Sequence, residues 1–178
     1  SFVRSKKDVL MLKNLILSET KHPVPVISKI EKPQAISKLE SILKVSDGLM
    51  VARGDLGLEI PTEEVPLNQK IMVEMAKKAR KPVIVATQMM ESMIDNLTPS
   101  RAEVNDVANS VMDGADCIML SGETSVGKYP CEVVRKIGKI ISSVENADFG
   151  LTQTDSVSIN KDRLITNSIF YNSALLAD

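Results

Sequence analysis

The chain has 178 residues, of which 43% are hydrophobic and 25% charged, with a formal net charge of −1. This composition is ordinary for a soluble globular protein and gives no reason to expect nucleic acid or an acidic membrane surface as a partner. No apolar run approaches the roughly 20 residues of a membrane span, and the start of the sequence lacks a signal-peptide pattern.

The hydrophobic pattern alternates between helical spacing and short apolar runs. Ser100 and Glu103 form a capping-box pattern at the start of one helix, and Pro33 and Pro130 suit the first turns of two others. The expected elements, in chain order, are a helix over 7–17, a strand over 24–31, a helix over 33–46, a strand over 49–52, a helix ending before 81, a strand over 83–87, a short helix over 90–94, a helix over 101–113, a strand over 116–121 and a helix over 130–144.

One helix followed by four β–α units predicts a parallel sheet covered by helices, which is the α/β class. Polar residues collect at the carboxyl end of each strand, where ligands bind in such folds. Four units make half of a (β/α)₈ barrel, which needs about 250 residues when complete. Periodicity alone leaves a half barrel and a small doubly wound sheet both open.

The rhythm of the pattern stops near residue 147, which suggests a domain boundary. We expect residues 1–147 to form the domain of β–α units and residues 148–178 to hold a linker and the truncated start of another domain. The polar stretch 148–161 resembles a linker, and 164–176 resembles a first helix.

Charged residues at the ends of the first two strands are the strongest functional signal. Lys29 and Glu31 share one face of their strand, and Asp55 follows the next strand just after Gly54. Two carboxylates that leave positions open for substrate oxygens and water suit Mg²⁺ or Mn²⁺, and a lysine beside them suits an anionic substrate. The turn that begins at Gly54 offers backbone N–H groups to a carboxylate or phosphate.

Each of these residues also has a simpler interpretation. Glu31 and Asp55 could be surface carboxylates, and Lys29 could be a solvated charge. Thr87, a lone hydroxyl at the end of the third strand, is more often a structural threonine than a ligand. The spacing by itself leaves metal binding and plain surface charge equally open.

Residues 122–128 match the first seven positions of a phosphate-binding P-loop, G-x-x-x-x-G-K, between a strand and a helix. The eighth position should be Ser or Thr to hold Mg²⁺, but it is Tyr129, and Pro130 follows at once. We therefore interpret the segment as a chance match.

The cysteines and methionines are expected to have structural roles, and the single histidine gives no sign of a metal site. Cys117 and Cys131 are expected to be reduced and buried and not to form a disulfide, so we expect a cytoplasmic location. The methionines lie at helical spacing and are expected to fill the core. The single histidine, His22, is in a loop, which argues against a multi-histidine metal site.

Four motifs, in order and at the expected spacing, closely resemble pyruvate kinases over residues 1–144. They are Ile27-Ser28-Lys29-Ile30-Glu31, Met50-Val51-Ala52-Arg53-Gly54-Asp55-Leu56-Gly57, Ala86-Thr87-Gln88-Met89 and Asp116-Cys117-Ile118-Met119-Leu120-Ser121-Gly122-Glu123-Thr124. The resemblance implies the second half of a TIM (β/α)₈ barrel. It also implies the family reaction, in which the phosphoryl group of phosphoenolpyruvate passes to ADP to give ATP and pyruvate in glycolysis.

The resemblance implies a role for each matching residue. Glu31 and Asp55 would hold the Mg²⁺ or Mn²⁺ ion that bridges the substrate, and Lys29 would stabilise the phosphoryl group in flight. Gly54, Asp55 and Thr87 would contact the carboxylate and enolate end of the substrate. This agrees with the residue-level interpretation, because phosphoryl transfer depends mostly on positioning and charge neutralisation.

The resemblance also implies that the chain is a fragment that begins at the end of the fourth barrel strand. The earlier half barrel, the lid domain, the potassium ligands and most of the C-terminal regulatory domain would lie outside it. We expect K⁺ dependence and a homo-oligomer, a tetramer in the family, for the full-length protein. Half a barrel leaves edge strands and apolar surface uncovered, so the fragment alone should be inactive and should associate.

Two other functions remain open at this point. A metal-dependent carbon–carbon lyase or aldolase also places Glu and Asp on successive strand ends to bind a pyruvate enolate, although Lys29 and the segment at Gly122 favour the kinase. A non-catalytic binding module is the third possibility, and the strand-end cluster argues against it.

Overall fold

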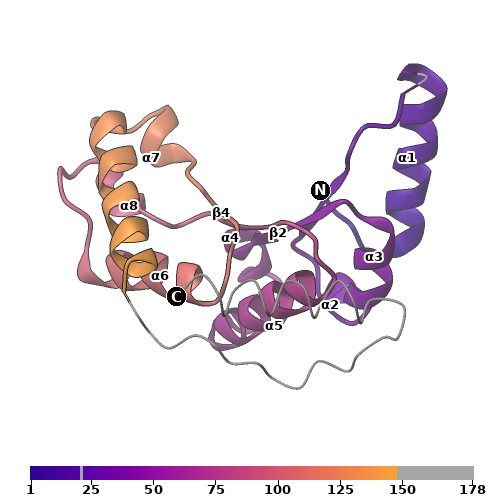
Figure 1. Ribbon diagram of the computed structural model, residues 1–178, viewed down its shortest axis with the longest axis horizontal. Helices are drawn as coiled ribbons and strands as arrows, with labels where there is room; N and C mark the ends of the chain where they lie inside the picture. Colours follow the sequence, from indigo (N-terminus) through magenta and orange to yellow (C-terminus); the bar gives the residue numbers. More distant parts are fainter. Residues whose placement is uncertain (21, 148–178) are drawn as a thin grey trace, which may run out of the picture. The chain divides into compact units, whose positions relative to one another are not determined.

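Parallel strands, paired in the order in which they occur along the chain, form the sheet of this protein. Figure 1 labels two of them, β2 and β4, and the helices around them. The computed structural model describes residues 1–20 and 22–147, and within them the strands are β1 (Ile27–Ile30), β2 (Gly48–Ala52), β3 (Val83–Ala86) and β4 (Cys117–Met119). The predicted parallel α/β sheet is confirmed. The strand order has no reversal, unlike a doubly wound sheet, and this is consistent with a segment of a barrel.

The helices alternate with these strands much as predicted. They are α1 (Lys6–Thr20), α2 (Pro33–Ile36), α3 (Leu39–Val45), α4 (Arg53–Leu56), η1 (Thr62–Glu64), α5 (Val65–Lys78), η2 (Glu91–Ile94), α6 (Arg101–Met112), α7 (Gly122–Ser125) and α8 (Pro130–Glu145).

Several details of the helices differ from the prediction. The single helix expected after Pro33 is two segments, because the backbone of Lys38 leaves the helical region, with φ −118° and ψ 15°. The short helix α4 was not predicted, and it holds Asp55. The capping box of Ser100 and Glu103 at the start of α6 is confirmed, with both reciprocal hydrogen bonds present.

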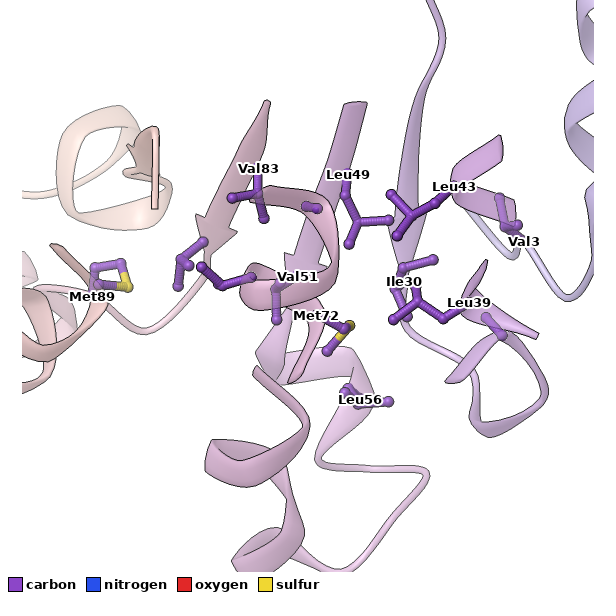
Figure 2. Packing of buried hydrophobic residues seen from close by; sticks show 14 of the residues in the cluster. Val3, Ile30, Leu39, Leu43, Leu49, Val51, Leu56, Met72, Val83 and Met89 are labelled. Carbon is purple, nitrogen blue, oxygen red and sulfur yellow. The ribbon is translucent and has the colours of Figure 1, made fainter. Parts of the chain in front are cut away.

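One face of the sheet is buried against helices. The register aligns Leu49 with Val83 and Val51 with Val85, and all four side chains are fully buried. Figure 2 shows Met72 of α5 pointing toward Val51 and Leu56, so α5 covers this face. The prediction that methionines fill the core is confirmed for four fully buried residues: Met72, Met89, Met90 and Met93.

The opposite face of the sheet is less covered by the residues that the structure describes. The register places Lys29, Met50, Ile84 and Cys117 in one row, and each keeps some solvent exposure. The expectation that both cysteines are buried is therefore wrong. They are free, as expected, but Cys117 is exposed on this face and Cys131 is exposed in the first turn of α8.

Helix α1 contacts α3, and only Val9 of α1 is fully buried. Its other apolar side chains stay largely exposed, including Leu12 at 44% and Leu15 at 57%. The wide apolar stripe predicted here is thus mostly unused within the described part of the chain.

The chain divides into a unit over Ser1–Ala147 and a unit over Asp148–Asp178. The predicted linker and truncated domain over 148–178 lie outside the described residues. Among the helices that the structure does describe, none is both long and apolar enough to span a membrane.

Candidate functional site

The ammonium group of Lys29 brings the predicted site residues together. Its Nζ lies 2.6 Å from Glu31 Oε2 and 2.7 Å from Asp55 Oδ2. Lys29 is on β1, Glu31 directly follows that strand, and Asp55 is in α4 directly after β2. The three charged groups predicted to meet at neighbouring strand ends therefore do meet.

These three groups differ in how far water reaches them. The side chain of Glu31 is 3% exposed, that of Lys29 28% and that of Asp55 52%. The second oxygen of Glu31 accepts a hydrogen bond from the backbone N–H of Phe2 at 2.5 Å, so both of its oxygens are engaged. Glu31 is thus fixed in place, whereas Asp55 faces solvent on the open side of the cluster.

The contacts of the cluster stabilise the charged forms of Lys29 and Asp55. The hydrogen bond from Lys29 lowers the pKa of the Asp55 carboxyl below its ordinary value. Hydrogen bonds to Asp55 and then to Glu31 raise the pKa of the Lys29 ammonium. At neutral pH the ammonium of Lys29 and the carboxylate of Asp55 are therefore both held in their charged forms.

Thr87 lies beside this cluster and is tied to Gly54. The N–H of Gly54 donates to Thr87 Oγ1 at 2.8 Å, and that hydroxyl donates to the carbonyl of Ala86 at 2.6 Å. A Cβ at position 54 would lie 3.2 Å from Thr87 Oγ1, which is a tight approach. The structure therefore explains Gly54 by the proximity of Thr87, and Thr87 also holds an unusual backbone angle, φ = 70°.

Arg53 is a further residue of this region that the sequence interpretation missed. Its guanidinium donates to both carboxylate oxygens of Asp106 in α6 and to the backbone carbonyls of Thr87 and Gln88. Its side chain is 10% exposed. An arginine directly after a buried strand, in a chain of balanced charge, was the signal available in the sequence.

The P-loop-like segment has a structural explanation. Lys128 forms an ion pair with Asp95 at 2.8 Å, and the helix after the segment begins only at Pro130. A Cβ on Gly127 would collide with the backbone carbonyl of Glu123, which accounts for the second glycine of the pattern. The interpretation as a chance match is consistent with these contacts.

Glu31 and Asp55 offer carboxylate oxygens, which are ligands of the kind that a magnesium-type ion uses. Mg²⁺ usually binds one or two carboxylates and completes its shell with water and substrate phosphates. Both carboxylates accept from the same ammonium, so they face a common point. Among residues 1–20 and 22–147, no group of three or more acidic, histidine or cysteine side chains could hold a metal, so any such ion would need ligands beyond these side chains.

A parallel α/β sheet with its charged cluster at the carboxyl ends of the strands is consistent with the α/β-barrel class. Residues 1–134 match the family model described as pyruvate kinase, barrel domain. The chain belongs to the pyruvate kinase family.

Curated relatives agree with this membership. The chain is 58% identical over 145 residues to pyruvate kinase of Mycobacterium tuberculosis and 54% identical over 145 residues to that of Thermotoga maritima. These matches cover 82% of this chain but only 30% and 31% of the relatives. Pyruvate kinase 2 of Synechocystis is 44% identical over 169 residues, which is 95% of this chain and 28% of that protein. The chain thus spans about a third of the length of the curated relatives it matches.

Proposed function

We propose that this chain supplies part of the active site of an enzyme that transfers the phosphoryl group of phosphoenolpyruvate to ADP. The products are ATP and pyruvate. The observation that carries the proposal is the meeting of Lys29, Glu31 and Asp55 at adjacent strand ends, in a member of the pyruvate kinase family. A second support is the position of Gly54 and Thr87 beside Asp55.

In this proposal each residue acts through charge or position. Lys29 neutralises the phosphoryl oxygens as charge develops on them, which requires it to exchange its present contacts with Glu31 and Asp55 for the substrate. The N–H groups of the turn that begins at Gly54 orient the carboxylate of the substrate. The hydroxyl of Thr87 does the same once it exchanges its present bond to the carbonyl of Ala86 for the substrate. Glu31, held by Phe2 and nearly excluded from water, is the fixed anchor of the group.

Glu31 and Asp55 would hold a Mg²⁺ or Mn²⁺ ion. When bound, such an ion neutralises phosphate charge and polarises the oxygens of the substrate. Asp55, which is half exposed, is free to turn its second oxygen toward a ligand, whereas Glu31 is the more rigid of the two. We place K⁺, the remaining nucleotide contacts and the oligomer contacts in the parts of the full-length relatives that this chain does not match. The cytoplasm is the proposed location.

The proposal is tested by replacing the matched 145-residue segment of the M. tuberculosis relative with the segment from this chain. The hybrid should form pyruvate from phosphoenolpyruvate and ADP. Lys29→Met should abolish phosphoryl transfer but leave the exchange of enolpyruvate protons with solvent, because that step needs the carboxylates and not the ammonium. Lys44→Met, at an exposed pair on α3, is the control and should keep normal turnover.

Each alternative has its own result. A folded hybrid without phosphoryl transfer but with cleavage of a carbon–carbon bond would point to a lyase. A folded hybrid that neither binds Mn²⁺ nor responds to changes at Glu31 and Asp55 would indicate a non-catalytic module. Equal loss of phosphoryl transfer and of enolpyruvate proton exchange in Lys29→Met would refute the role given to the lysine.

A further inference from the structure

Arg53 connects three separate parts of the chain next to the proposed substrate site. From the start of α4 its Nη1 lies 2.7 and 2.6 Å from the two oxygens of Asp106 on α6. Its Nη2 lies 2.7 Å from the carbonyl of Thr87 and 3.1 Å from that of Gln88, in the segment after β3. One guanidinium thereby fixes the exit of β2, the exit of β3 and a helix to each other.

The segment that Arg53 holds is strained. Thr87 and Gln88 have φ angles of 70° and 54°, in the left-handed region that non-glycine residues seldom adopt. Thr87 is also β-branched, which makes this conformation more costly. Two consecutive residues of this kind persist only when their surroundings impose the conformation, and such strain concentrates at functional sites.

The arrangement is also unfavourable in another respect. The Nε atom of Arg53 is buried and has no hydrogen-bond partner among the described residues. A buried donor without a partner destabilises the fold. A residue present only for stability would not be expected to combine this orphan donor with two strained neighbours.

We propose that Arg53, with its charge balanced by Asp106, is a positioning residue that holds Thr87 in the left-handed conformation. In this conformation the Thr87 hydroxyl accepts a hydrogen bond from the N–H of Gly54, the residue before Asp55. Lysine cannot replace it, because a single ammonium lacks the planar fork that reaches the carboxylate and two carbonyls together. The consequence for substrate binding rests on the proposed function, but the conformational role does not.

The conformational role is tested on the 178-residue chain by amide hydrogen exchange at Gly54. Leu49, whose N–H bonds to the carbonyl of Pro82, is the reference within the same molecule. Arg53→Lys should speed exchange at Gly54 by about tenfold relative to Leu49, the change expected for loss of one net hydrogen bond. Arg135→Lys, at an exposed pair on α8, is the matched control and should change neither amide.

A glycine at position 88 separates this mechanism from general loosening. Glycine adopts positive φ without steric cost, so the turn should keep its shape with less help from Arg53. Adding Gln88→Gly to Arg53→Lys should therefore restore most of the protection of Gly54. Asp106→Asn is a milder change, to be used if Arg53→Lys does not fold. It should also reduce the protection of the Gly54 amide, but by less. Unchanged protection in both single variants, or no rescue by glycine, would overturn the proposal.

Kinetics of the hybrid enzyme test the consequence for the substrate. Arg53→Lys should raise KM for phosphoenolpyruvate by about tenfold while kcat falls much less, because Thr87 contributes binding and not the transferred charge. The Gln88→Gly addition should lower KM again. An inactive hybrid with the original sequence would refute the proposed function but not the conformational role, which the exchange experiment decides separately. Loss confined to kcat would refute the positioning role.

Discussion

The buried carboxylate of Glu31 depends on Lys29 for its counter-charge, and this dependence can be measured. Replacing Lys29 with Met leaves a side chain that is 3% exposed with one remaining partner, the N–H of Phe2. Breaking a buried pair from one side costs about 3–5 kcal/mol, whereas a hydrogen bond to a charged group is worth about 1.5–3 kcal/mol. Because Lys29 is itself 28% exposed, we expect a loss of about 2–3 kcal/mol.

Urea unfolding of the 178-residue chain and its Lys29→Met variant gives this difference directly. Lys44→Met is the control, since its pair with Glu40 is exposed on both sides and should cost well under about 1 kcal/mol. Adding Glu31→Leu to Lys29→Met should recover most of the loss, because the uncompensated charge is then gone. If Lys29→Met costs no more than Lys44→Met, the described dependence of Glu31 on Lys29 is wrong.

The same variant probes the proposed cation. Lys29 occupies the point that both carboxylates face, so the ammonium and a metal ion compete for the same oxygens. Removing the ammonium should make Mg²⁺ stabilise the chain more than it stabilises the original sequence, by mass action. An equal response of both proteins to MgCl₂ over the millimolar range would refute this competition.

Four further outcomes are expected. Because the pKa of Asp55 is lowered in the folded state, its contribution to stability is complete above the ordinary pKa of 3.8 and is lost as the pH falls through the lower pKa of the folded protein. In Asp55→Asn, the urea concentration at the unfolding midpoint should therefore depend less on pH in that acid range. Met72→Ala removes a fully buried side chain and should cost about 2–5 kcal/mol by urea unfolding, with unchanged circular dichroism. Ser100→Ala removes the capping acceptor of Glu103 and should cost about 0.5–2 kcal/mol in the same assay. The 178-residue chain alone should form no pyruvate in a coupled assay and should elute above its 19.4 kDa mass in gel filtration.

The sequence predicted those features that depend on periodicity and local chemistry. The alternation of strands and helices predicted the parallel sheet, and the spacing of Ser100 and Glu103 predicted the capping box at the start of α6. The meeting of Lys29, Glu31 and Asp55 followed from their places at strand ends, because the carboxyl ends of adjacent parallel strands share one edge of the sheet. Their roles in binding metal and substrate stay predictions.

Contacts that no local sequence pattern indicates were beyond such reasoning. Arg53 and Asp106 are 53 positions apart, and no local pattern pairs them. The left-handed conformation of Thr87 was not predictable either, since a β-branched residue is among the last expected there. The structure explains this conformation, because the carbonyl of Thr87 accepts a hydrogen bond from the guanidinium of Arg53.

The wrong prediction for Cys117 has a physical cause that also bears on the site. Apolar residues in a parallel strand are expected to be buried on both faces, because helices usually cover both sides of such a sheet. In the described residues, helices cover the face of the sheet that carries Leu49 and Val83. The opposite face, with the row of Lys29, Met50 and Cys117, is less covered. Lys29 belongs to that less covered face. The same geometry that leaves Cys117 exposed therefore lets the ammonium of Lys29 reach past the strand end to the solvent-facing carboxylate of Asp55.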